Sequence, residues 1–180
     1  MKLSPAQTMT RTIEGTGKAK MKETLVAAAL ALSPFAASML PAQTIEISSA
    51  EERTSARGPD RAYTGVGIAE FLFQANDASP LTAAEISFEP GARTAWHNHP
   101  AGQYLIVTAG VGWVQARGEE KRVVRAGDVV WTPPGVFHWH GATATQGMRH
   151  LAVWEFVDGS GGELGEHVSD DEYLAEAAAD

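Results

Sequence analysis

Residues 91–103, with the sequence GARTAWHNHPAGQ, decide the fold of this 180-residue chain. His97 and His99 are separated by one residue, so on a β-strand both side chains point to the same face. Pro100-Ala101-Gly102 predicts a turn directly after them, and Gln103 begins the next predicted strand. Because neutral imidazoles that meet at one point suit a divalent cation, this strand–turn–strand unit predicts one half of a metal site.

Residues 127–140, GDVVWTPPGVFHWH, repeat the arrangement further along the chain. His138 and His140 form a second pair with the same spacing, again after a turn of proline and glycine. His150 opens the last predicted strand. Any single histidine is more often an ordinary core or surface residue, but two His-x-His pairs that both follow turns favour metal binding.

The region from residue 62 to residue 157 consists of short apolar and β-branched runs separated by glycine or proline. This spacing, with no long helical pattern between the runs, predicts an all-β sandwich or barrel. A capping box, Ser169 to Glu172, predicts a short C-terminal helix over residues 169–179. The predicted strands are 63–67, 69–73, 83–88, 95–99, 103–108, 110–116, 121–125, 128–132, 136–140 and 150–157.

The first 42 residues differ from the rest in composition. An apolar run over residues 25–40 follows Lys20 and Lys22 and ends in small residues, which is typical of a secretory signal peptide. Met21 then becomes the natural start of translation, and residues 43–180 form a single domain that is periplasmic or secreted, with no membrane contact after removal of the signal. The alternative for the apolar run is a buried alanine-rich helix.

The charge balance and the absence of cysteine exclude several classes of function. The chain has 22 acidic and 14 basic residues, a formal net charge of -8, which disfavours nucleic acid as a partner. With no cysteine, it has neither disulfides nor thiolate metal ligands nor a cysteine nucleophile. Any metal must therefore be held by histidine, carboxylate or amide groups.

The two histidine segments resemble the two conserved motifs of the cupin superfamily. Gly91, His97, His99 and Gly110 stand at the positions of the first motif, in which Gln103 replaces the usual glutamate. Residues 127–138 match the second motif through its histidine, whereas Ala142 replaces a later asparagine. The resemblance implies a small cupin barrel (a double-stranded β-helix, or jelly roll) with its motifs over residues 88–157. The implied ligands of a metal in the barrel mouth are His97, His99, Gln103 and His138.

Within the superfamily, the chain resembles the bacterial cupin-type hydroxynitrile lyases. The shared segments are FEPGARTAWHNHP (88–100), LIVTAGVGW (105–113), GDVVW (127–131) and HWHGA (138–142). This resemblance implies cleavage of aromatic (R)-cyanohydrins, such as mandelonitrile, to an aldehyde and HCN. It also implies a divalent metal, manganese first, with iron, zinc or nickel as alternatives.

The chemistry implied by this resemblance assigns roles to the remaining site residues. Three neutral imidazoles and a neutral carboxamide leave the charge of the cation uncompensated, which favours stabilisation of an anion. A histidine that is not a ligand can act as general base, His150 in the first place and His140 in the second, unless His140 only orients a ligand. Thr94 is expected to hydrogen-bond the substrate. The expected pocket wall is Ala84, Ile86 and Trp154.

Two other functions use the same features. A cupin dioxygenase or other oxidoreductase would need a redox-active metal and would consume oxygen. A non-enzymatic periplasmic protein would bind a metal or a small molecule without turnover. In each case we expect a small-molecule ligand and a homodimer or homotetramer.

Overall fold

The computed structural model describes residues 44–178, which lie in one of the two units into which the chain divides, residues 44–180. The predicted signal peptide, the start at Met21 and the boundary at residue 42 lie outside the described residues. The elements are β1 (Ser55–Arg57), β2 (Tyr63–Thr64), β3 (Gly67–Phe73), β4 (Leu81–Phe88), β5 (Arg93–Thr94), β6 (His97–Asn98), β7 (Gln103–Ala116), β8 (Arg122–Arg125), β9 (Val129–Thr132), β10 (His138–Ala142), β11 (Met148–Glu155), β12 (Glu163–Leu164) and α1 (Asp170–Leu174).

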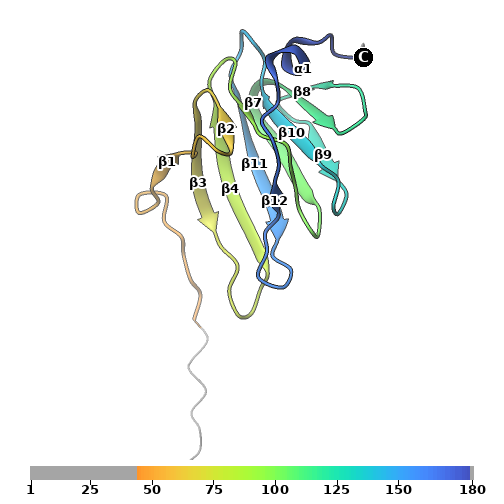
Figure 1. The fold of residues 1–180 in the computed structure, drawn as a ribbon. Helices are drawn as coiled ribbons and strands as arrows, with labels where there is room; N and C mark the ends of the chain where they lie inside the picture. The colour runs from red at the N-terminus through yellow and green to blue at the C-terminus, as the bar shows by residue number, and fades with distance from the viewer. Residues whose placement is uncertain (1–43, 179–180) are drawn as a thin grey trace, which may run out of the picture. The chain divides into compact units, whose positions relative to one another are not determined.

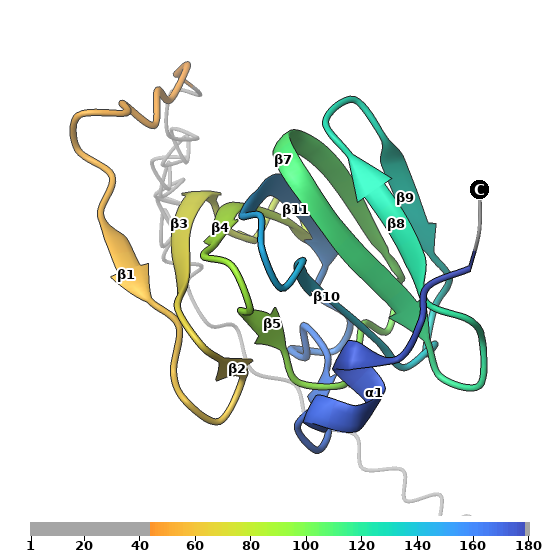
Figure 2. The same ribbon diagram turned by 90° about the horizontal axis from the view of Figure 1, so that it is seen from above.

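The strands form one antiparallel sheet that curls around an interior (Figures 1 and 2). Its strand order is β1-β3-β4-β11-β7-β10-β5-β2. The long strand β7 joins the two layers, because its first half pairs with β11 and β9 and its second half pairs with β10 and β8. The predicted all-β barrel architecture with a C-terminal helix is confirmed.

Strand β7 replaces the two strands predicted over residues 103–108 and 110–116. The chain bends within it at Gly110, whose φ is 76°. A Cβ atom at this position would lie 2.0 Å from the carbonyl oxygen of Gly147, so only glycine fits the bend. The sequence pattern therefore located the bend correctly, but the hydrogen bonding continues through it.

Alternation along the central strands builds the interior. In β7, Gln103, Leu105 and Val107 are buried, while Tyr104 and Ile106 between them are exposed. The antiparallel register sets these inward positions into rows across the sheet, because cross-strand partners share a face. The rows are Gln103, Trp154 and Thr82; Leu105, Ala152 and Ala84; and Val107, His150 and Ile86.

A second buried cluster lies between the other layer and the C-terminal segment. It contains Trp96, Trp139, Val168 and Tyr173. The predicted capping box is confirmed, since Ser169 and Glu172 exchange the side-chain and backbone hydrogen bonds that define it. The cluster anchors the C-terminal segment over β10, where the Tyr173 hydroxyl donates to the Ala142 carbonyl.

The helix ends at Leu174 and not at residue 179 as predicted. Lys121 Nζ donates to the carbonyls of Tyr173 and Ala175, which caps the last turn. The amide of Ala178 then donates to the carbonyl of Lys121, so the chain continues extended alongside β8. A tertiary contact therefore ends the helix where local propensity favours its continuation.

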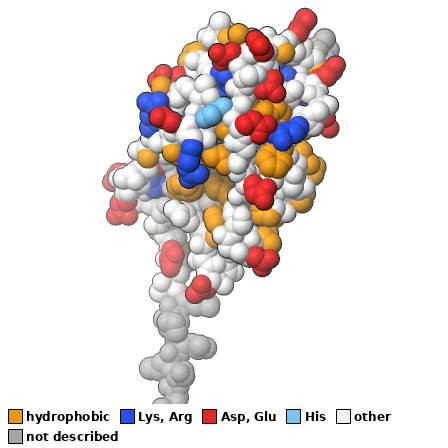
Figure 3. Space-filling model, in the orientation of Figure 1, with side chains coloured by type: hydrophobic (Ala, Val, Ile, Leu, Met, Phe, Trp, Pro, Cys, Tyr) orange, Lys and Arg blue, Asp and Glu red, His pale blue; other side chains and the backbone are white. Residues whose placement is uncertain are grey.

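The described part of the chain contains no helix long and apolar enough to cross a membrane. On the face shown in Figure 3, basic side chains are scattered among acidic and hydrophobic ones.

Candidate metal centre

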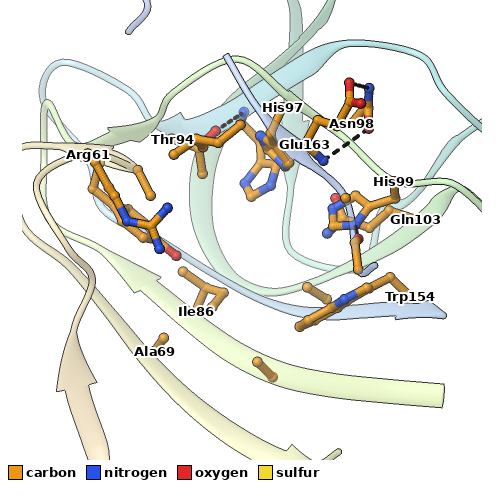
Figure 4. A pocket seen from close by; sticks show the side chains of 18 of the residues that line it. Arg61, Ala69, Ile86, Thr94, His97, Asn98, His99, Gln103, Trp154 and Glu163 are labelled. Atoms are coloured by element: carbon orange, nitrogen blue, oxygen red, sulfur yellow. Dashed lines mark hydrogen bonds between the residues drawn. The ribbon is translucent and has the colours of Figure 1, made fainter. Parts of the chain in front are cut away.

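A cavity of about 410 Å³ opens between the two layers (Figure 4). We call the layer formed by β1, β3, β4, β11, β9 and the first half of β7 the first layer. Its small side chains, Ala69, Ala84 and Ala152, leave the space, and Ile86 and Phe71 complete an apolar floor. The opposite side is polar and carries the histidine segments. A volume of this size is typical of small-molecule sites.

Strand pairing brings the two histidine segments together. His97 on β6 is the cross-strand partner of His138 on β10, and their ring centroids lie 4.3 Å apart. His140 follows on the same face of β10, with its ring 5.2 Å from that of His97. His99 lies directly after β6, and its ring is 5.3 Å from that of His97. The two predicted pairs therefore meet at one place.

Three of the rings are held by main-chain carbonyls, and we call His97, His99 and His138 the anchored trio. Their Nδ1 atoms lie 3.0, 2.6 and 3.0 Å from the carbonyl oxygens of Ala95, Gly161 and Val136, respectively. A proton on Nδ1 that is donated to a carbonyl leaves the lone pair on Nε2. All three rings are thus set to present Nε2 as a metal ligand.

Burial keeps these imidazoles neutral. It lowers the pKa of His138 to about 4, and it lowers the pKa of His97 well below its usual value, with a contribution from the charge of His138. The pKa of His99 is also lowered by burial. At neutral pH the anchored trio therefore consists of uncharged ligands.

The contact between His138 and Gln103 carries the clearest sign of a cation. The Gln103 Oε1 atom lies 3.0 Å from His138 Nε2. When His138 Nδ1 donates to Val136, two acceptor atoms face each other there, and the low pKa of His138 leaves no proton to join them. Donor atoms at right angles around an octahedral cation at about 2.1 Å are about 3 Å apart, so the pair fits a shared cation.

Two further rings hold each other, and we call His140 and His150 the paired imidazoles. His150 Nε2 lies 3.2 Å from His140 Nδ1, and the ring centroids are 4.8 Å apart. Burial lowers the pKa of His150 to about 4 and that of His140 well below its usual value. Phe88 packs against both rings. His140 Nε2 and His150 Nδ1 are buried without a hydrogen-bond partner among the described residues.

The nitrogen atoms that lie close enough together to share a metal belong to some, but not all, of the predicted ligands, and to one residue that was not predicted as a ligand. Nitrogen atoms of His97, His138 and His140 lie within 4.8 Å of one another. His99 is outside this group, although its buried Nε2 has no partner among the described residues. Gln103 joins through its contact with His138. The donor set, neutral nitrogen atoms and one amide oxygen, fits a divalent transition metal.

The other predicted site residues divide between the cavity and its surroundings. Thr94, Ala84, Ile86, Trp154 and His140 line the cavity. The Thr94 hydroxyl accepts a hydrogen bond from the backbone amide of His140 at 3.1 Å. This bond holds His140, a candidate general base, next to another residue of the cavity lining. His150 is 0% exposed and, like His138, does not line the cavity, but its Nε2 contacts His140, which does.

Sequence reasoning missed the rim that closes the cavity. Arg61 lies before β2, and Asn98 and Glu163 pair across β6 and β12. The glycine-rich run 159–162 packs against His99, because Gly161 supplies its carbonyl acceptor. Gly162, with φ of 147°, lies so close to β6 that a Cβ atom would be 2.0 Å from the backbone carbonyl oxygen of Asn98. The sequence GSGG at residues 159–162 could have indicated a close-packed loop, whereas no local sequence pattern identifies Arg61 as a residue of the cavity rim.

A curled β-barrel with histidines from two hairpins at its mouth defines the cupin class, and comparison with known proteins agrees. Residues 84–154 match the cupin domain family Cupin_2. The crystal structure of a cupin-like protein from Thermotoga maritima superimposes with a TM-score of 0.62 at 38% identity, over 66% of this chain and 90% of that one. A predicted oxalate decarboxylase from the same organism shares the fold alone, with a TM-score of 0.55 at 22% identity over 62% of this chain and all of that one.

The chain is 48% identical over 129 residues to the (R)-mandelonitrile lyase of Granulicella tundricola. The alignment covers 72% of this chain and 98% of that protein. It therefore belongs to the cupin superfamily, in the family that includes this lyase.

Proposed function

We propose that the protein is a metal-dependent carbon–carbon lyase that cleaves, and in reverse forms, aromatic (R)-cyanohydrins such as mandelonitrile. The observation that carries the proposal is that the neutral anchored trio and Gln103 meet His140, whose Nε2 has no hydrogen-bond partner in the described part of the chain, beside a cavity with an apolar floor. The similarity to a mandelonitrile lyase over nearly the whole of that protein supports the reaction class.

Manganese is the metal that we propose, held by His97, His99, Gln103 and His138. A bound divalent cation supplies Lewis-acid stabilisation of the anions formed in the reaction. The neutral carboxamide of Gln103, in place of a carboxylate, does not cancel the charge of that cation. The three rings would be oriented toward it by their main-chain anchors, and Gln103 Oε1, beside His138 Nε2, would complete the ligand set.

His140 is the group that moves the proton. Its Nδ1 donates to His150 Nε2, which leaves the Nε2 lone pair available to accept the hydroxyl proton of a cyanohydrin. As that proton leaves, the oxygen forms the aldehyde carbonyl, and the bond to the nitrile carbon breaks with its electron pair on cyanide. The low pKa of His140 makes the protonated ring a ready donor, so the proton passes on to cyanide as HCN. His150 is a positioning residue, and Thr94 keeps His140 in place through its backbone amide.

The cavity wall selects an aromatic aldehyde. Apolar side chains of β3, β4 and β11 cover one side of the aryl group, and the Trp154 ring narrows the end near His99, with ring centroids 5.6 Å apart. Burial of an aromatic ring against such a wall is favourable because it removes apolar surface from water.

The proposal is tested with purified protein that has been stripped of metal and reloaded with manganese, iron, zinc or nickel separately. We expect conversion of mandelonitrile to benzaldehyde and cyanide above the spontaneous rate, highest with manganese, and its loss on chelation. Oxygen consumption without cyanide release would indicate an oxidoreductase. Tight metal retention with neither reaction would indicate a binding protein.

We also propose a homodimer or homotetramer, built on the outer face of the first layer. Two cross-strand apolar pairs lie exposed there: Tyr104 with Trp131, whose rings are 4.5 Å apart, and Ile106 with Val129. Trp131 is 45% exposed and Val129 62% exposed, which is much apolar surface for two neighbouring strands. Light scattering on wild type and Trp131→Glu tests this, since a monomeric wild type would contradict it.

Export to the periplasm or out of the cell is a further proposal, which depends on residues 1–42 and no others. The apolar run after Lys20 and Lys22 supports it. Fractionation of cells that express the full chain, with sequencing of the mature N-terminus, tests it. A cytoplasmic protein that starts at residue 1 would contradict it.

A further inference from the structure

Arg61 is a cation at the cavity rim that has no acidic partner within residues 44–178. Among the described residues that line the cavity, it is the one lysine or arginine, and Glu163 is the one acid. Figure 4 places Arg61 on the side of Ile86 and Ala69, away from His99 and Glu163. Within the described part of the chain, the guanidinium has no hydrogen bond or ion pair.

The acid adjacent to Arg61 in the sequence and the one acid among the described residues of the cavity lining have other partners. The adjacent Asp60 lies 3.5 Å from Arg57. Glu163 accepts from the Asn98 side-chain amide at 3.2 Å, and its own backbone amide donates back to Asn98 at 3.2 Å. The charge of Arg61 is thus available to a ligand in the cavity.

The backbone of Arg61 is held in place by the site itself. The turn that contains it is closed by the Ala62 amide, which donates to the Pro59 carbonyl at 2.9 Å. The Ala62 carbonyl then accepts from the Ala95 amide at 2.8 Å, two residues before His97. The backbone of Arg61 therefore has a defined position relative to the metal ligands, and its exposed side chain extends from this fixed point to the cavity rim.

We propose that Arg61 binds a carboxylate of the substrate, so that the preferred substrates are aromatic aldehydes and cyanohydrins with an acidic group on the ring end remote from the metal. The cavity of about 410 Å³ has room beyond an unsubstituted ring. Guanidinium is suited to carboxylate because its planar donors match both oxygens. The inference rests on the proposed lyase function, whose substrate class it narrows.

The test compares 4-formylbenzoate with its neutral methyl ester, each with cyanide, on the manganese-loaded full chain at fixed ionic strength. We expect kcat/KM for the carboxylate to exceed that for the ester by about 10-fold, mainly through KM. Arg61→Met should remove this preference, and Arg61→Lys should keep part of it. Arg57→Met is the matched control, because it removes the same charge from a neighbouring residue that does not line the cavity.

Calorimetric binding of the same two aldehydes without cyanide separates this inference from the lyase function. Carboxylate-selective binding that is lost in Arg61→Met, without turnover of any cyanohydrin, would support the anion site and contradict the lyase. Equal conversion of acid and ester by wild type would overturn the anion site and leave the lyase intact. A preference for the carboxylate that survives in Arg61→Met would show that the carboxylate binds elsewhere, on the metal for example, and would overturn the inference. The absence of both binding and turnover would also overturn it.

Discussion

The anchored trio and the paired imidazoles are the same chemical group in the same barrel mouth, held in two different ways. Each ring of the trio gives its Nδ1 proton to a main-chain carbonyl, which cannot accept the ring's charge or exchange the proton with it. His140 Nδ1 instead faces His150 Nε2, at 3.2 Å, and the two rings share the one proton between these atoms. A carbonyl anchor fixes the tautomer and makes a ligand, whereas an imidazole partner leaves a proton free to move.

Each group also contains one ring that does not line the cavity. His97, His99 and His140 line it, whereas His138 and His150 do not, and Phe88 packs against the His150 ring. The sequence alone ranked His150 above His140 as a base. Because His140 lines the cavity and His150 contacts it from the interior, we assign the base to His140, and this assignment stays a prediction.

The largest effect is expected from His138→Ala, which removes a ligand from the trio and the partner of Gln103. We expect loss of stoichiometric metal and a fall in cyanohydrin cleavage of about 100-fold or more. Elemental analysis and the cleavage assay measure both. His167→Ala is the control, since His167 is exposed and bonds only the Thr64 hydroxyl. A metal-retaining, active His138→Ala protein would refute the proposed ligand set.

Removal of the His140 side chain should show whether the paired imidazoles contribute to the reaction rate and not to metal binding. In His140→Ala we expect kcat to fall by about 100-fold with metal content retained, as for the loss of a general base. Loss of the metal together with the rate would instead show that His140 belongs with the ligands, as its distance to His97 and His138 permits.

His150 should have a smaller effect, because it acts through His140. We expect about a 10-fold decrease in kcat for His150→Ala, with a change in the pH profile and with the metal retained. His150→Gln should restore part of the rate, since its carboxamide can accept from His140 Nδ1. An unchanged pH profile in both variants would reduce His150 to a packing residue.

Gly162→Ala tests a carbonyl anchor without touching a histidine. The new Cβ would clash with the Asn98 oxygen and displace Gly161, which holds His99. We expect about a 10-fold lower metal affinity in a chelator competition. Gly159→Ala is the control, because its φ of 80° carries similar strain but a Cβ there meets nothing within 4 Å. An equal loss of metal affinity in both variants would indicate that backbone strain alone causes it, and not displacement of Gly161.

The smallest effect is on the stability of the metal-free protein. His138 and His150 have a pKa of about 4 when folded and about 6.5 when unfolded, so the unfolded chain takes up the proton first as the pH falls. Stability is therefore full above pH 6.5 and is lost toward pH 4, by roughly 0.7 kcal/mol per ring between pH 7 and pH 6. Urea midpoints at several pH values measure this. A midpoint that rises on acidification would show that the rings are not buried in the neutral form.

Much of the fold was readable because its signals are local. Turns with proline and glycine, alternation of burial and the capping box at Ser169 each depend on a few adjacent residues, and the structure contains each of them. Among the boundaries that differ, two do so for a non-local reason. Strand β7 continues through Gly110 because β11 pairs with the residues up to Gly110 while β10 and β8 pair with the residues after it, and α1 ends at Leu174 because Lys121 caps it.

The site divides in the same way. By itself, the sequence determined that the members of each histidine pair share one face, because side-chain direction in a strand follows from spacing. The carbonyl anchors of His97 and His138 are equally local, since each acceptor lies two residues before its ring. Only the tertiary structure decided which ring lines the cavity, that Gly161 holds His99, that Gln103 meets His138 and where Arg61 stands, because these properties depend on contacts between segments far apart in the chain, about which spacing along one strand carries no information.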